Sequence, residues 1–313
     1  MTRYRNFLLF LALAAVWGAA FAAIKAGLQF FPPVLFAAIR YDVAGVVMLG
    51  YAVYATDRPV PRTRGEWALA LNGAVLLIAG YHVLLFVGEN DPAVTSAAAA
   101  VIVSLNPVLT TGFARAFLPD ERLAAAGVVG LVLGLVGVAV LADPDPANLL
   151  AGDVIAKLLI LGAAASFGLG SVLARRIPAE LPIETMEAWS MLLGALVMHA
   201  VSLGLGESVA AVRWTPRALW SLAYLSLAAS ALGFLIYFDL LERLGAIEIN
   251  LVSYVAPVWA ALVGWAVLSE TPSLRTGLGF LIIFAGFVLI KRETLSEELP
   301  RLRRGIREAL WRN

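Results

Sequence analysis

Cysteine is absent from this chain of 313 residues, and histidine occurs only twice. The lack of cysteine excludes disulfide bonds, thiolate metal sites and cysteine nucleophiles. Two histidines are too few for an oxidative metal centre, because such centres take several imidazole ligands. We therefore expect neither a metal site nor a bound cofactor.

Charge is also scarce. Charged residues make up 14% of the chain and hydrophobic residues 61%, and the mean hydropathy is +0.87. A soluble domain of this length needs more charge on its surface. The formal net charge is only +1, and we expect a lipid bilayer as the main partner and no nucleic acid.

Motifs for the common energy-converting and hydrolytic chemistries are missing as well. The sequence has no G-x-x-x-x-G-K-[ST] phosphate loop, so ATP cannot drive the protein directly. It has neither H-E-x-x-H nor G-x-S-x-G, the motifs of zinc proteases and serine hydrolases.

The apolar residues come in ten blocks of about twenty, the length that a helix needs to cross about 30 Å of hydrocarbon. Short turn segments such as Asn90-Asp91-Pro92 separate the blocks. The first block has no small-residue cleavage site before a soluble domain, so we expect a span and not a removable signal peptide. The sequence predicts an all-α integral membrane protein with these spans: Leu8–Leu28, Pro33–Tyr54, Trp67–Val87, Ala93–Arg115, Leu123–Leu141, Gly152–Leu173, Met186–Leu205, Ala218–Leu240, Ile247–Leu268 and Leu274–Ile290.

Lys and Arg gather in every second connection. Arg58 and Arg62 follow the second span, and Arg175 and Arg176 follow the sixth, whereas the connection around Asp143 is acidic. Basic connections lie on the cytoplasmic side of a membrane. The pattern predicts a multi-pass protein of the cell membrane with both termini in the cytoplasm.

The last segment, residues 291–313, differs from the spans. Apolar residues recur there at steps of three or four, with arginines between them: Leu295, Leu299, Leu302, Ile306 and Leu310. This pattern predicts a basic amphipathic helix on the anionic cytoplasmic leaflet. The alternative is a frayed, solvated tail.

The chain contains an internal repeat. A shift of 150 positions aligns Trp17-Gly18 with Phe167-Gly168 and Pro107 with Pro257. Each half holds five predicted spans, and an odd number inserts the second half upside down relative to the first. The sequence thus predicts two inverted five-helix repeats, residues 8–141 and 152–290.

At this point the residues resemble a known family. The segment from Ala97 to Glu121, with Pro107 and Pro119-Asp120-Glu121, resembles the fourth-helix signature of the drug/metabolite transporter superfamily, EamA type. The segment from Asn250 to Glu270, with Pro257 and Ser269-Glu270, is similar to its second copy.

The resemblance runs from about Leu8 to Ile290. It implies ten helices, a central cavity lined mainly by helices one to four and six to nine, and export or exchange of small metabolites such as amino acids. The second half departs from the first in one respect. Ser190 stands at the position that matches Arg40, so a role of Arg40 is not duplicated.

Arg40 and Asp42 lie seven or more residues inside the second span, where an unpaired charge costs at least about 2.5–3.5 kcal/mol. Residues two apart do not share a helix face, so each needs its own partner. Glu89, at the same side of the third span, is the favoured partner of Arg40. The pair is either a structural lock between helices two and three, or part of a gate or a site for a substrate carboxylate.

Six residues are candidates for a substrate-binding cavity: Trp17, Tyr81, His82, Ser104, Asn250 and Tyr254. A histidine in mid-membrane can bind substrate or take a proton, or it can be a neutral hydrogen-bonding group between helices. The aromatic residues can line a cavity or simply pack and face lipid. We expect His82 to face a central cavity shared with Trp17, Ser104, Asn250 and Tyr254.

Two prolines and a glycine stripe are further structural signals. Pro107 and Pro257 each remove a backbone hydrogen bond and should kink the fourth and ninth spans, which makes these helices candidate gates; alternatively, the prolines are merely tolerated. Glycines on one stripe of the fifth span allow close approach of another helix. That stripe (Gly127, Gly130, Gly134 and Gly137) joins either the two halves or two protomers of a homodimer.

These patterns favour a secondary transporter that moves a small-molecule substrate by alternating access, driven by the solute gradient or by protons. The alternative is an intramembrane enzyme acting on lipid-linked substrates, which needs clustered carboxylates or histidines at the interface. A non-transporting scaffold is a third hypothesis, and the mid-membrane Arg40 and Asp42 argue against it.

Overall fold

The structure, a computed structural model, describes residues 2–118, 125–142, 152–244, 249, 251–290 and 292. Every regular element in these ranges is a helix. The helices of the first half are α1 (Thr2–Gly27), α2 (Pro33–Ala55), α3 (Arg64–Asn72), η1 (Gly73–Gly80), α4 (Tyr81–Glu89), α5 (Ser96–Val103), α6 (Asn106–Phe117) and α7 (Ala125–Ala142). Those of the second half are α8 (Gly152–Ala174), α9 (Ile183–Gly204), η2 (Val209–Ala211), α10 (Pro216–Ala223), η3 (Tyr224–Leu232), α11 (Gly233–Leu244), α13 (Val252–Leu268) and α14 (Leu274–Ile290).

Several of these helices join end to end into longer rods. Within the described ranges, seven helices or rods are long and apolar enough to cross a membrane, and three shorter apolar helices, Gly127–Ala142, Val252–Leu268 and Leu274–Ile290, accompany them. The predicted all-helical membrane class is confirmed. The predicted tail, residues 291–313, lies outside the described residues except for Arg292.

The two halves share an unusual local structure. In the first half, α3 starts at the N-cap Thr63 and passes into the π-helix η1, and α4 follows. In the second half, α10 starts at the N-cap Thr215 and passes into the π-helix η3, and α11 follows. A π-helix has one more residue per hydrogen-bonded turn than an α-helix and is rare. Its occurrence at matching places supports the internal repeat seen in the sequence.

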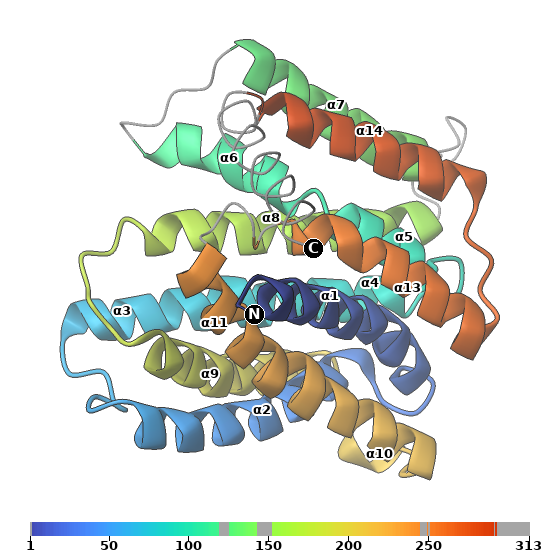
Figure 1. Cartoon of the computed structure of the whole chain (residues 1–313). Helices are drawn as coiled ribbons and strands as arrows, with labels where there is room; N and C mark the ends of the chain where they lie inside the picture. Colours follow the sequence, from blue (N-terminus) through green and yellow to red (C-terminus); the bar gives the residue numbers. More distant parts are fainter. Residues whose placement is uncertain are drawn as a thin grey trace.

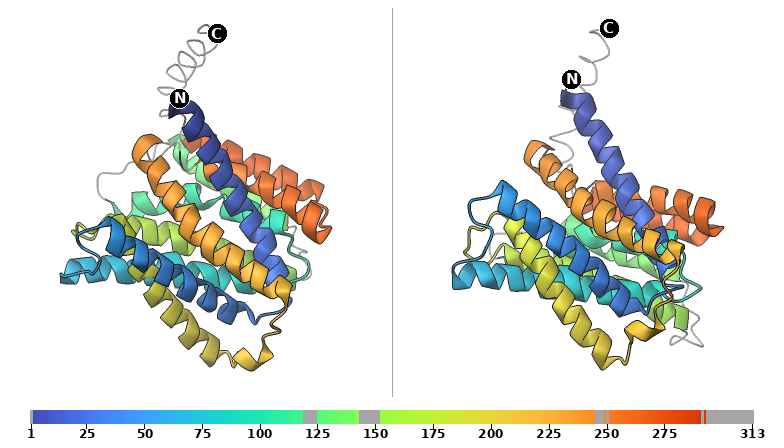
Figure 2. Two further views of the ribbon diagram at one scale, coloured as in Figure 1. Left: turned by 60° about the horizontal axis from the view of Figure 1, so that its bottom comes forward. Right: turned by 90° about the horizontal axis from the view of Figure 1, so that it is seen from below.

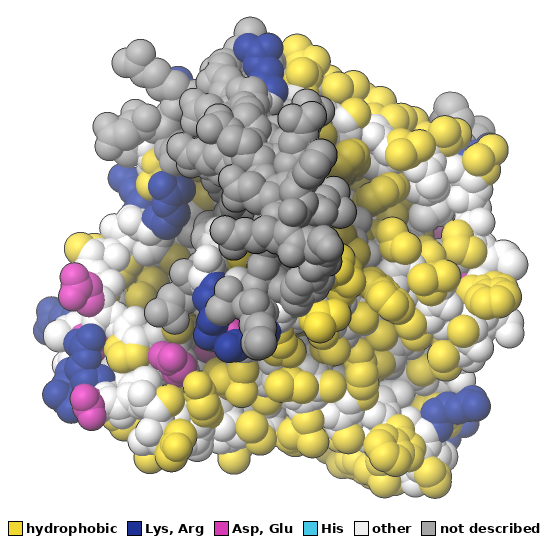
Figure 3. Space-filling model, viewed as in Figure 1, with side chains coloured by type: hydrophobic (Ala, Val, Ile, Leu, Met, Phe, Trp, Pro, Cys, Tyr) yellow, Lys and Arg dark blue, Asp and Glu magenta, His cyan; other side chains and the backbone are white. Residues whose placement is uncertain are grey.

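The helices pack in layers (Figure 1). Equivalent helices of the two halves lie side by side, α2 with α9 and α7 with α14, while α1 packs on α13 and α6 on α8. Figure 2 shows the N-terminal turns of α1 projecting beyond the neighbouring helices. Large apolar side chains cover much of the outer surface, and charged side chains gather toward its edges (Figure 3). Such a surface suits lipid and not water.

The predicted glycine stripe packs inside the chain. A Cβ on Gly130 would lie 2.5 Å from the carbonyl oxygen of Gly286, and one on Gly137 would lie 2.8 Å from that of Gly279. The helices α7 and α14 therefore touch backbone to backbone. Of the two alternatives for the stripe, the structure favours the junction between the two halves.

The two prolines are not placed alike. In the fourth predicted span the α-helix stops at Val103, Ser104 and Leu105 form a turn, and Pro107 lies in the first turn of α6. Proline is tolerated there because its missing N–H has no helical partner at that position. Pro257 instead lies inside α13.

The bundle has two ends. The turns 28–32, 90–95, 205–215 and 269–273 form the first, called the Lys25 end, and the turns 56–63 and 175–182 belong to the opposite one, called the Arg58 end. At the Lys25 end, both carboxylate oxygens of Glu207 accept hydrogen bonds from the first backbone N–H groups of α2, those of Val34 and Leu35, at 3.1 and 2.7 Å. The backbone N–H of Arg213 donates to the carbonyl of Phe30 at 2.9 Å. These bonds tie the second half to the first.

Candidate functional site

Arg40 is buried in the middle of the bundle. Its Nε donates to the Ser230 hydroxyl at 3.2 Å, and its guanidinium lies over the ring of Tyr41, 5.0 Å from the centroid. The hydrogen bond predicted between Arg40 and Glu89 is absent, because the guanidinium extends to η3 and not to the end of α4. The two terminal nitrogens of Arg40 have no hydrogen-bond partner among the described residues.

Asp42 lies on a different face of α2 from Arg40, as the two-residue spacing predicts. Its carboxylate pairs with His199 Nε2 of α9 at 2.7 Å, and both side chains are partly exposed on the outer surface. Exposed Val43 and Val46 are its neighbours on that surface. Asp42 therefore does not belong to the same site as Arg40.

His82 is held inside the wall of the bundle. Its Nδ1 lies 2.8 Å from the carbonyl oxygen of Ile78, and its Nε2 lies 2.8 Å from the Tyr41 hydroxyl. A carbonyl oxygen only accepts, so Nδ1 carries a proton and donates. Nε2 is then free to accept from Tyr41, as in a neutral imidazole. Tyr81 packs its ring on that of His82, at a centroid distance of 4.6 Å.

This geometry sets an expected result for His82→Ala. The substitution leaves the buried Tyr41 hydroxyl without its acceptor, which costs about 1–3 kcal/mol. Tyr41→Phe removes that hydroxyl, so the double variant should lose less stability than the two single losses added together. Thermal unfolding of the four proteins in detergent measures this coupling, and strictly additive losses would contradict the bond.

The other cavity candidates lie in separate clusters. Trp17 donates its Nε1 to the carbonyl of Ala229 at 3.1 Å and packs on α11. Tyr254 packs on Phe287 of α14, with ring centroids 4.5 Å apart. Ser104 donates its hydroxyl to the carbonyl of Val101, three residues earlier in the last turn of α5. The contacts described do not join these residues to one another, the shared cavity stays a prediction, and Asn250 lies outside the described residues.

Glu187, on α9, is a buried acid that the sequence reasoning missed. Only 8% of the residue is exposed, and its carboxylate makes no hydrogen bond or ion pair with the described residues. It lies close enough to Tyr41 and Tyr237 to interact with both electrostatically. The predicted seventh span starts at Met186, which placed Glu187 at the membrane surface. The helix starts at Ile183 instead and carries Glu187 into the bundle.

Lys25 and Glu89 form a second charged group, at the Lys25 end. The Lys25 ammonium donates to the backbone carbonyls of Glu89, Asp91 and Val94 at 2.9, 2.5 and 2.7 Å. The Glu89 side chain is fully buried, and neither carboxylate oxygen has a hydrogen-bond partner in the described part of the chain. Glu270, which follows α13, accepts from the backbone N–H of Ser96 at 2.9 Å and so caps α5.

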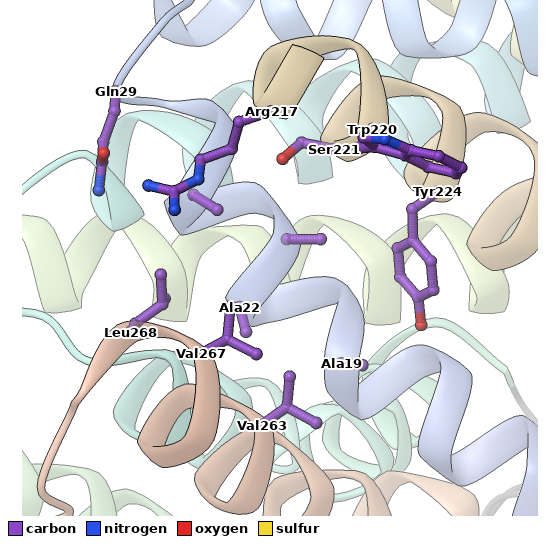
Figure 4. Close-up of a pocket in the computed structure, with 12 residues that line it drawn as sticks. Ala19, Ala22, Gln29, Arg217, Trp220, Ser221, Tyr224, Val263, Val267 and Leu268 are labelled. Atoms are coloured by element: carbon purple, nitrogen blue, oxygen red, sulfur yellow. The ribbon is translucent and has the colours of Figure 1, made fainter.

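A pocket of about 370 Å³ lies between α1, α10 and α13 (Figure 4). Half of its lining residues are alanine or valine, with Gln29, Arg217 and Leu268 at the Lys25 end and Tyr224 deeper inside. None of the residues predicted for the site lines it. Its polar side chains include those of Gln29, Arg217, Ser221 and Tyr224.

The comparisons with known proteins agree with each other. Residues 5–142 and 154–292 each match the sequence model of the EamA-like transporter family. The "Uncharacterized inner membrane transporter YedA" of Escherichia coli K12 is 31% identical over 280 residues, which cover 89% of this chain and 88% of that protein. The "Uncharacterized transporter YvbV" of Bacillus subtilis is 28% identical over 98% of each chain. A solved crystal structure, 23% identical, superposes with a TM-score of 0.64 over 91% of this chain and 96% of that one, which shows the fold alone.

Proposed function

We propose that this chain, which belongs to the EamA-like transporter family of the drug/metabolite transporter superfamily, exports or exchanges small organic metabolites such as amino acids by alternating access. The family and the relatives' names are those of transporters and not of enzymes. The alternative of a lipid-processing enzyme gains no support from the described residues, where no three His, Asp or Glu side chains cluster as a metal site.

In this proposal the chain crosses the membrane ten times. The seven long spans and the three shorter apolar helices supply the ten crossings. Residues 8–141 and 152–290 are the two repeats, inverted relative to each other because each has five crossings. The contacts between equivalent helices, α2 with α9 and α7 with α14, fit a two-fold axis between the halves.

The Lys25 end faces the exterior and the Arg58 end the cytoplasm, according to the distribution of arginines. The test uses the natural absence of cysteine. We expect Ala147→Cys to react with an impermeant thiol reagent on intact cells, and Ala179→Cys to react only after the membrane is opened. The reverse pattern would overturn the proposed orientation.

The observation that carries the proposed substrate class is the burial of two opposite charges in the bundle, Arg40 on α2 and Glu187 on α9. The Arg40 guanidinium lies over the ring of Tyr41, 5.0 Å from the centroid, and the Glu187 carboxylate has a weaker, purely electrostatic influence on the same tyrosine. Both groups are buried and keep hydrogen-bonding capacity that the described residues do not use. A buried guanidinium binds a carboxylate, and a buried carboxylate binds an ammonium group. In this proposal, a solute that carries both groups pairs with these two side chains.

The packing supports a state that is closed to the exterior. At the Lys25 end, α5 packs on α13 and Glu270 bonds across that contact. Beyond the turn at Ser104, α6 packs mainly on α8. The two parts of the fourth span thus pack on two different helices of the second half, α13 and α8, which makes the turn at Ser104 a candidate hinge of the gate. The driving force in this proposal is the solute gradient or an exchanged proton.

Transport by the purified protein in liposomes tests the proposal. The panel contains amino acids, monocarboxylates of the same size and the matching amines. We expect exchange of labelled amino acids above that of empty liposomes, and weaker transport of solutes that lack either charge. Equal transport of all three classes would remove Arg40 and Glu187 from substrate recognition.

A further inference from the structure

Glu89 occupies an uncommon environment for an acid. It ends α4 at the Lys25 end, it is fully buried, and both of its oxygens lack a hydrogen bond. An ionised carboxylate in such a place loses its hydration without compensation. A neutral carboxylic acid is tolerated far better, and this difference makes the site sensitive to proton binding.

The charged groups around Glu89 come from several elements. Lys25 of α1, Arg40 of α2 and Glu270 after α13 all interact with it electrostatically, without a hydrogen bond, as does Tyr81 of α4 itself. On α8, Asp153 and Lys157 are paired with each other at 3.1 Å. Among these cations, Lys25 has the strongest electrostatic interaction with Glu89. Its ammonium already donates its three protons to backbone carbonyls.

Those three carbonyls belong to the last residue of α4 and to the connection between α4 and α5. Lys25 therefore fixes this connection to α1, while Glu270 fixes the start of α5 to α13. The two contacts together close the Lys25 end. If Glu89 became ionised, its carboxylate would compete with the carbonyls for the Lys25 ammonium, because a charge-assisted hydrogen bond is the stronger one.

The geometry points to Glu89 as a proton-binding site that controls the external gate. With a proton on Glu89, Lys25 stays on the three carbonyls and the gate is closed. When the proton leaves, Lys25 turns to Glu89, the connection 90–95 is released and the gate opens. This inference rests on the proposed orientation of the transporter, and it couples a proton to the conformational step.

Chemical labelling tests the inference without any transported solute. Ser96 is fully buried at the gate, and its hydroxyl has no hydrogen-bond partner, so Ser96→Cys reports opening when an impermeant thiol reagent is added to intact cells. Ala210→Cys, in the exposed helix η2, is the matched control. Its rate corrects for the reagent's own pH dependence.

We expect the corrected labelling of Ser96→Cys to fall by up to about tenfold per pH unit as the external medium is acidified, as for one titrating group. Adding Glu89→Gln, which mimics the protonated acid, should give slow labelling at every pH. Adding Glu89→Asp should keep the pH dependence. The inference would be overturned if the Glu89→Gln variant kept the pH dependence of labelling, or if Ser96→Cys were labelled faster in that variant than in the protein with Glu89.

The outcomes separate this inference from the proposed function. If no solute of the panel is transported but the pH dependence of the labelling requires Glu89, the proposed role of Glu89 in the gate is supported and the proposed substrate class is wrong. If Ala210→Cys does not react from outside, the orientation is wrong, and the same series on inside-out vesicles decides the role of Glu89.

Discussion

Arg40→Gln should reduce amino-acid transport by roughly 10- to 150-fold, because a hydrogen bond to a charged group contributes about 1.5–3 kcal/mol. Glutamine keeps a polar side chain and can still bond to Ser230, but it cannot neutralise a substrate carboxylate. Arg40→Lys should retain part of the activity, since it keeps the charge and loses the planar fork. Initial rates of exchange in liposomes, at equal protein content, measure the effect.

Asp42→Asn is the matched control for Arg40→Gln. Asp42 lies two residues further along the same helix, but its partner is His199 on the outer surface. We expect transport close to that of the unchanged protein. Equal losses in the two variants would show that Arg40 acts through the packing of α2 and not through the substrate.

Gly279→Ala should destabilise the protein by about 1–3 kcal/mol, the usual effect of overpacking a tight contact. The added Cβ would lie 2.7 Å from the carbonyl oxygen of Gly137 and 2.9 Å from Cβ of Leu141. Neither atom can move without separating α7 from α14, since one is backbone and the other is bound directly to it. Thermal unfolding in detergent measures the loss.

The same helix offers the control, Gly277→Ala. No atom lies within 4 Å of a Cβ at Gly277, and alanine favours a helix more than glycine does. We therefore expect unchanged or slightly raised stability. If both variants lose stability alike, the close contact between α7 and α14 is not what the glycines provide.

Sequence patterns predicted the helical class and most of the spans because each rests on a local property, the run of apolar residues. They also separated Arg40 from Asp42, because helical spacing fixes which residues share a face. Partner choice is different. Arg40 reaches Ser230, 190 positions away in the sequence, and only the packing of α2 on η3 brings them together.

Two residues show why the site itself was harder to predict. Glu187 was missed because the predicted start of its span was three residues late, and that small shift moved the acid from the interior to the interface. His82 was predicted to face a central cavity, and that stays a prediction; the structure shows it buried in the third span. Its bonds to Tyr41 and Ile78 depend on neighbouring helices and on the local turn, which hydropathy does not encode.

The π-helices η1 and η3 have a consequence for how this protein can move. Ile78, whose carbonyl binds His82, lies in η1, and Ser230, which binds Arg40, lies in η3. When a π-helical segment converts to an α-helix, the part of the rod beyond it rotates about the rod axis. The rotation is about 100° for each residue by which the helical register shifts. Such a rotation keeps the backbone ladder nearly intact while it changes the direction in which a side chain points. Arg40 and His82 can therefore exchange their hydrogen-bond partners when the rods that contain η1 and η3 rotate about their axes, without either rod having to bend.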